Sequence, residues 1–318
     1  MTKLLQVCLI VTGITLMLAV WKFWLAPREL APANSMSPTV QAATISLEPA
    51  KSVDEIGEIA GYDFSEKKKN VQVVELPKSL KEVSGMALTN DGRLLCHNDE
   101  NGTVFEIDPI KNIEVKRFYV GKPLVLGDFE GIAAKGDTLF LVESSGNLFR
   151  FFEGESGTHV RYDYFKTPLT SKNNVEGLAY DPETDCLLLA CKGDPGKGFD
   201  DYKAVYSFSL KTYQLAPQPR FLLPLKIILK QTGENEFNPS AIERHPVTGN
   251  FYVMAFNGHA IVEVDRTGGL LGVSTLKKSV NAQPEGLAIS ENGTVYIGNE
   301  GRKKVAKLTV YPPVGSGE

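Results

Sequence analysis

The chain has 318 residues, of which 42% are hydrophobic and 23% charged, and its formal net charge is −4. These values are ordinary for a globular protein. The sequence has no long run of Lys and Arg to contact phosphates, so nucleic acid is not an expected partner. Of the 4 cysteines, one lies in the apolar N-terminal run and the other three are an odd number, so no disulfide framework is predicted.

The first predicted element is a membrane anchor at residues 1–28. Residues 4–21 form an almost unbroken apolar run, and about 18 residues of helix span roughly 27 Å, close to the thickness of a bilayer core. Trp21 and Trp24 suit the interface between membrane and water. The run is longer than the apolar part of a typical signal peptide. We therefore expect an uncleaved, single-pass helix, with a cleaved signal peptide as the alternative.

The next segment, residues 29–70, is predicted to be a flexible linker. It is rich in Pro, Ala, Ser and Thr and shows no hydrophobic period. Such segments bury too little apolar surface to fold alone.

Residues 71–318 contain five repeats of one pattern. Each repeat opens with a short apolar segment, continues through a turn into two further strand-like segments, and ends in a fourth β-rich run. The opening segments are VSGMAL at 83–88, FEGIA at 129–133, VEGLAY at 175–180, PSAI at 239–242 and PEGLAI at 284–289. Their equivalent polar residues are separated by 46, 46, 64 and 45 residues. This spacing is typical of four-stranded propeller blades.

The repeats predict an all-β fold, a β-propeller of five four-stranded blades. Six blades is the alternative, and a β-sandwich or open solenoid is the competing class. The fourth β-rich runs are IEVKRFYV, HVRYDYFK, FLLPLKIIL and LGVSTLKK. The early run VQVVEL, at 71–76, is predicted to supply the outer strand of the last blade and so to close the ring. Closure of this kind protects strand edges. We expect the ectodomain, residues 71–318, to be monomeric.

Strand alternation places the starts of the first strands and the loops after the second strands on one face of the propeller. Three Glu-Gly pairs stand at equivalent strand starts, at Glu130, Glu176 and Glu285. The other polar residues predicted on this face are Ser84, Asp99, Glu100, Glu143, Lys192, Ser240, Asn257, Asn299 and Glu300. We interpret this face as the ligand-binding mouth of the channel.

The Glu-Gly pairs allow two interpretations. In the structural one, Gly permits close approach of backbones and Glu bonds amides of a neighbouring blade. In the functional one, three carboxylates converge on the channel and bind a divalent cation. Oxygen donors favour Ca²⁺, and the absence of His or Cys among them disfavours Zn²⁺. Lys192 is either a channel-facing cation or a counter-ion for these acids.

The repeats also resemble a known family. The segments EVSGMAL, HNDENGTVFEID, DFEGIA, VESSGNLFRF, NNVEGLAYD, FNPSAI and PEGLAIS are similar to those of the SdiA-regulated, or YjiK-like, proteins. The resemblance covers about residues 71–310. It implies a propeller held on the periplasmic side of a bacterial inner membrane, with no established reaction. A more distant resemblance to calcium-dependent propeller hydrolases implies that Glu130, Glu176 and Glu285 match metal-binding acids.

Three hypotheses for function follow. The first is a membrane-tethered periplasmic module that binds a small ligand or an envelope protein at the acidic face, with a divalent-cation site at the channel mouth. The second is a calcium-dependent hydrolase of small esters, lactones or phosphoesters, which needs a metal-activated water. The third is a structural repeat protein without a small-molecule site. We favour the binding module.

Overall fold

The computed structural model describes residues 28–29, 55–64 and 71–314. Among these residues, no helix is long and apolar enough to cross a membrane. The predicted anchor run, residues 4–21, lies outside the described residues, as do residues 30–54 and 65–70 of the predicted linker.

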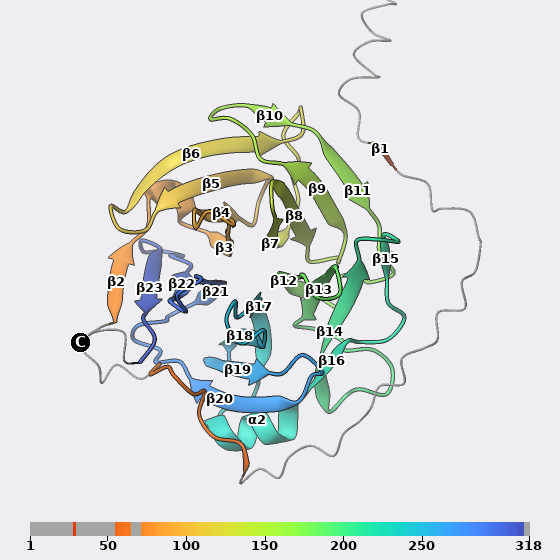
Figure 1. Cartoon of the computed structure of the whole chain (residues 1–318), viewed down its shortest axis with the longest axis vertical. Helices are drawn as coiled ribbons and strands as arrows, with labels where there is room; N and C mark the ends of the chain where they lie inside the picture. Colours follow the sequence, from red (N-terminus) through yellow and green to blue (C-terminus); the bar gives the residue numbers. More distant parts are fainter. Residues whose placement is uncertain (1–27, 30–54, 65–70, 315–318) are drawn as a thin grey trace, which may run out of the picture.

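Five antiparallel sheets surround a central axis as the blades of a propeller (Figure 1). The main strands of blade 1 are β3 (Val83–Leu88), β4 (Leu94–Asn98), β5 (Thr103–Asp108) and β6 (Ile113–Val120). Those of blade 2 are β7 (Phe129–Lys135), β8 (Thr138–Glu143), β9 (Leu148–Phe152) and β11 (Tyr162–Phe165). Blade 3 contains β12 (Val175–Asp181), β13 (Cys186–Cys191), β14 (Tyr202–Ser209), β15 (Gln214–Leu215) and β16 (Phe221–Pro224). Blade 4 contains β17 (Asn238–Arg244), β18 (Phe251–Asn257), β19 (Ala260–Val264) and β20 (Leu270–Thr275). Blade 5 contains β21 (Pro284–Ile289), β22 (Val295–Asn299), β23 (Lys307–Tyr311) and β2 (Gln72–Glu75). The prediction of five blades is therefore confirmed.

The ring closes through the early strand. β2 pairs antiparallel with β23, with Gln72 opposite Val310 and Glu75 opposite Lys307. Blade 5 therefore combines strands from the two ends of the described region, as the run VQVVEL predicted. This pairing covers the edge of β23, which would otherwise present unpaired backbone groups.

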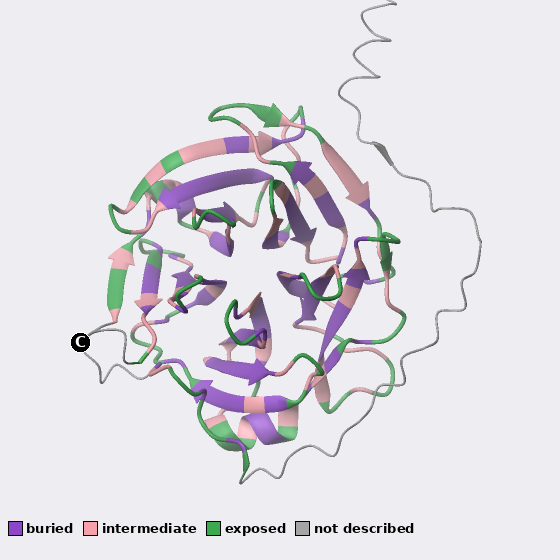
Figure 2. Cartoon of the chain, viewed as in Figure 1, coloured by how far each residue is buried: buried purple, intermediate pink, exposed green. Residues whose placement is uncertain are grey.

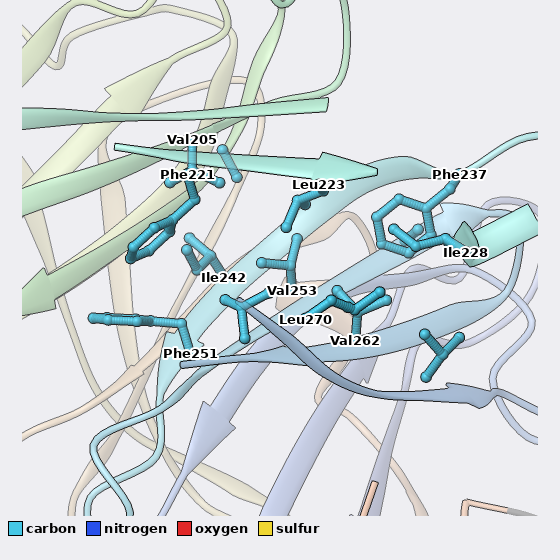
Figure 3. Packing of buried hydrophobic residues seen from close by; sticks show 14 of the residues in the cluster. Val205, Phe221, Leu223, Ile228, Phe237, Ile242, Phe251, Val253, Val262 and Leu270 are labelled. Atoms are coloured by element: carbon cyan, nitrogen blue, oxygen red, sulfur yellow. The ribbon is translucent and has the colours of Figure 1, made fainter. Parts of the chain in front are cut away.

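Each pair of neighbouring blades encloses its own hydrophobic core, and the described residues form five such clusters. Between blades 3 and 4, the rings of Phe221 and Phe251 lie 5.3 Å apart, and Val253 and Leu223 pack beside them (Figure 3). The inner strands are almost wholly buried, whereas exposed residues gather on loops and outer strands (Figure 2). Burying one large apolar side chain stabilises by about 1.5–3 kcal/mol, so these interfaces hold the ring.

Two of the predicted fourth strands differ in the structure. The run FLLPLKIIL divides at Pro224 into β16 and the helix α2 (Leu225–Thr232), because Pro cannot donate to a strand ladder but can precede a helix. Helix α2 buries Ile227 and Ile228 and ends at Gly233, whose φ of 70° is left-handed.

The run HVRYDYFK also divides. Its first part, β10 (His159–Val160), pairs in parallel with β6 of blade 1, and β11 alone continues blade 2. The short strand β1 (Arg28–Glu29) pairs in parallel with the outer side of β11. A short 3₁₀ helix, η2 (Lys78–Leu80), precedes β3.

Residues 55–64 pack on the propeller as a strap, although they fall within the predicted flexible linker. Ile56, Ile59 and Phe64 are buried, with at most 4% of each residue exposed. The carbonyl of Gly57 accepts a hydrogen bond from the Val273 amide at 2.9 Å. The linker prediction fails here because apolar residues that follow no hydrophobic period can still be buried in hydrophobic cores, in this case those beside blade 4.

Candidate functional site

The innermost strand of every blade contains a β-bulge at the same place. In β7, Phe129 pairs with Glu143 and Gly131 pairs with Val142, so Glu130 has no partner in the ladder. The same skip occurs once in each of the other inner strands, and the unpaired residues are Ser84, Glu130, Glu176, Ser240 and Glu285. A bulge redirects one side chain out of the regular alternation. These five residues therefore form a ring at one face of the channel, which we call the mouth face.

The glycines that follow the bulged acids allow neighbouring inner strands to approach closely. A Cβ atom added at Gly131 would lie 2.8 Å from the backbone nitrogen of Leu178, and one at Gly177 would lie 2.8 Å from that of Ile242. The structural interpretation of Glu-Gly is thus correct for Gly. It is wrong for Glu, because the bonds that the three acids make are to side chains and not to amides of the neighbouring blade.

Three acids line one narrow hollow at the centre of the ring: Glu130, Glu176 and Glu285. Ser84 donates a hydrogen bond to Glu130 over 2.9 Å. Lys192 forms an ion pair with Glu176, with 3.0 Å between Nζ and Oε1. Lys192 is thus a counter-ion that also lies at the channel. No other Lys or Arg forms an ion pair with these three acids among the residues that the structure describes.

Burial shapes the charge of the ring. Burial, followed by the carboxylates of Glu176 and Asp128, raises the pKa of Glu130 to about 9. Burial and the Glu176 carboxylate likewise raise the pKa of Glu285 to about 8, although Lys192 opposes the shift. The pKa of Glu176 is also raised by burial, with Lys192 acting against it. Without an added cation, Glu130 and Glu285 therefore keep their protons near neutral pH.

The ring acids have donor atoms that suit a metal ion, but they are not arranged around one. Within the described part of the chain, no group of three or more His, Cys, Asp and Glu side chains is arranged to hold a metal ion. All three acids lining one hollow are oxygen donors, which suit a hard cation. Direct coordination by all three at once would require their carboxyl groups to move toward one another.

The remaining predicted residues separate into groups. Ser240 turns toward blade 5 and donates to the carbonyl of Pro284 at 2.7 Å. Asp99 and Glu300 lie near each other on the mouth face between blades 1 and 5. The side chain of Asn299 instead faces blade 4, where it donates to Asn281 at 3.4 Å. Glu143 stays with its own loop, where Ser145 donates to it over 3.2 Å.

Two predicted residues lie at the edge of the mouth face. Asn257 ends β18 opposite Asn238, and no side-chain bond of Asn257 is observed within the described residues. Glu100 is exposed, and its carbonyl accepts a hydrogen bond from the amide of Gly127. The structure brings neither of them to the ring acids.

Sequence reasoning missed the polar residue two positions before each bulge. Asn174 donates to Glu176 at 2.7 Å, and Gln283 donates to Glu285 at 3.3 Å. The full equivalent set is Glu82, Asp128, Asn174, Asn238 and Gln283. The repeats do contain the signal, since an oxygen-bearing side chain, an apolar residue and then Glu or Ser recur in all five. Residues two apart on a strand share a side, so the pattern predicts a second polar layer.

Comparison with known proteins agrees with this architecture. The profile of the SdiA-regulated family matches residues 125–302, which is more than half of the chain. The chain belongs to the SdiA-regulated family. The match covers the second to fifth bulges and so three of the ring acids, in the chain order that the repeats predicted. Among curated protein sequences, none matches this SdiA-regulated chain.

Solved structures similar to this SdiA-regulated propeller include a luciferin-regenerating enzyme, with a TM-score of 0.50 and 11% identity over 77% of this chain and 96% of that one. A glutaminyl cyclase from Myxococcus xanthus has a TM-score of 0.48 and 15% identity, over 77% of this chain and 97% of that one. The PQQ-bound aldose sugar dehydrogenase of Streptomyces coelicolor has a TM-score of 0.49 and 12% identity, over 76% and 98%. At such low identity, the likeness concerns the fold alone.

Proposed function

We propose that this SdiA-regulated protein is a membrane-tethered periplasmic binding module whose channel mouth takes a cation. The observation that carries the proposal is the imbalance of charge in the ring. Glu130, Glu176 and Glu285 line one hollow, and Lys192 pairs with only one of them. The apolar run at residues 4–21 and the family resemblance support the location.

Glu130 and Glu285, the two ring acids that do not pair with Lys192, must each be neutralised by a proton or by a cation, because an isolated buried carboxylate is costly. Burial holds protons on Glu130 and Glu285, and a bound cation would displace them. Ca²⁺ is the metal candidate that the oxygen donors favour, since it accepts 6–8 oxygens in loose geometry. The three acids would be its protein ligands, with waters completing the shell.

The test is thermal unfolding of the detergent-solubilised, metal-free chain with added Ca²⁺ or with chelator. A site filled at a hundredfold excess over its dissociation constant adds about 2.7 kcal/mol of stability. We expect Glu130→Gln and Glu285→Gln to weaken this gain. Glu291→Gln is the matched control, because Glu291 is exposed in the turn between β21 and β22, on the opposite face.

The outcomes separate the hypotheses. Melting of the wild-type chain that ignores Ca²⁺ and chelator alike would remove Ca²⁺ as the ligand. Calcium-dependent turnover of small esters, lactones or phosphoesters that disappears in Glu176→Gln would make the protein a hydrolase instead of a binding module.

A further inference from the structure

A second acidic group lies beside the ring, between blades 5 and 1. The side-chain amide of Gln283 donates to Glu285 in the ring at 3.3 Å and also to Glu300 outside it. Burial raises the pKa of Glu300, the nearby Arg302 guanidinium opposes the shift, and the carboxylate of Asp99 adds to it. A continuous series of carboxyl groups therefore runs from the channel to the rim of the mouth face.

Two buried oxygens without a donor belong to this second group. Among the described residues, the buried side-chain oxygens that lack a hydrogen-bond partner are Asn98 Oδ1, Asp99 Oδ1, Gln283 Oε1 and Asn299 Oδ1. Gln283 and Asn299 are only 7% and 3% exposed. Asn299 faces blade 4, where its amide donates to Asn281 and Thr309. The unpaired acceptors of the second group are therefore Asp99 Oδ1 and Gln283 Oε1. Buried acceptors are rarely left unpaired, so the group lacks a ligand rich in N–H donors.

The two acid groups have different centres. The ring acids line the hollow, whereas Asp99 and Glu300 lie outside it at the rim. The described acids lack a metal-binding arrangement, but separate ammonium groups need no common centre.

We propose that the mouth binds a linear diamine or polyamine, with one ammonium among the ring acids and another between Asp99 and Glu300. This inference rests on the proposed function, since it specifies the cation that the mouth takes. The alkyl chain lies along Gln283, which joins the two acid groups, and the unpaired oxygen of Gln283 accepts a hydrogen bond from the second ammonium. An ammonium group carries three donors and no acceptor, which matches both the acids and the unpaired oxygens.

The test is isothermal titration calorimetry of the full-length, metal-free chain in detergent with diaminobutane, butylamine or Ca²⁺. We expect diaminobutane to bind at least about tenfold more tightly than butylamine, because the second ammonium makes its own contacts. The heat should depend on the buffer, since binding displaces protons from the ring acids.

Two variants locate the ammonium groups. Glu300→Gln should remove the advantage of diaminobutane over butylamine, whereas Glu130→Gln should weaken both amines. Glu291→Gln is the control, and a single cooperative melting transition of each variant in the absence of ligand verifies its folding. Equal affinity of the two amines in the wild-type chain, or a diamine advantage that survives in Glu300→Gln, overturns the inference. If Ca²⁺ binds and neither amine does, the proposed function stands and the inference fails; if nothing binds, both fail.

Discussion

At the scale of single residues, a bulge converts an ordinary inner strand into a support for one channel-facing side chain. The same bulge presents Ser in two blades and Glu in three, so the ring has one architecture and unequal chemistry. Lys192 compensates Glu176, and burial leaves Glu130 and Glu285 protonated. We therefore expect the stability of the ring to depend on pH and, under the proposed function, on cations.

The first prediction concerns this pH dependence. Glu130 has a pKa of about 9 in the folded protein, against an ordinary value of about 4.3. Between these values the native state holds a proton that the unfolded state has lost, so stability falls as pH rises. Each pH unit costs at most about 1.4 kcal/mol for one such group. In chelator, we expect denaturant titrations from pH 6 to pH 8 to show a shallower decline for Glu130→Gln.

Other acids with a raised pKa limit how much Glu130→Gln can reduce the pH dependence of stability. Glu285 and the half-buried Glu243 each have a pKa raised to about 8, so part of the decline in stability with pH remains in Glu130→Gln. Glu130→Gln should nevertheless be more stable than the wild-type chain at pH 8, and Glu291→Gln should retain the full slope. Identical slopes for the wild-type chain and Glu130→Gln would show that Glu130 is ionised in the folded state.

At the scale of elements, the strap at residues 55–64 joins blades 4 and 5 on the face opposite the mouth. His245 Nδ1 accepts the amides of Val247 and Thr248, each at 3.2 Å, so its Nε2 carries the proton. That Nε2 donates to the Tyr62 hydroxyl at 2.8 Å, and the hydroxyl donates to the carbonyl of Gly293 at 2.6 Å. The strap thereby fastens turns of two different blades.

The second prediction tests this fastening. Tyr62→Phe leaves the His245 Nε2–H and the Gly293 carbonyl without their partner, and we expect a loss of about 1–2 kcal/mol in the free energy of unfolding. Tyr202→Phe is the matched control, because no hydrogen bond of its hydroxyl is observed among the described residues. Urea denaturation measures both variants. Equal midpoints for Tyr62→Phe and the wild-type chain would mean that the strap does not contribute to stability.

At the scale of the whole molecule, Tyr62 of the strap lies on the face opposite the mouth. The hydrogen bonds of Tyr62 reach the turns that follow the inner strands, and the amide of Val314 donates to the carbonyl of Gly61 at 2.8 Å. The strap and the last described residues therefore lie together, and the mouth face stays clear of them. A tethered propeller with this arrangement can present its acidic mouth to soluble ligands.

The third prediction concerns the tether itself. We expect the full-length chain to remain in the membrane fraction after a carbonate wash, because an apolar helix is not released by removing ionic contacts. Protease added to spheroplasts should degrade the propeller from outside. A chain that starts at residue 52, which keeps the strap, should be soluble in the same assay. Release of the full-length chain by carbonate would contradict the anchor.

The sequence alone determined the ring of blades, because strand alternation and turn residues are properties of short segments. Segments that repeat the same pattern adopt the same geometry. The sequence therefore placed Glu130, Glu176 and Glu285 at equivalent points and predicted that residues 71–76 close the ring. Only the tertiary structure decided which acid is paired, because the distance to Lys192 and the depth of burial depend on packing between blades. The docking of residues 55–64 was likewise invisible in the sequence, since its apolar side chains have no period and gain their stability only from cores formed by residues far away along the chain.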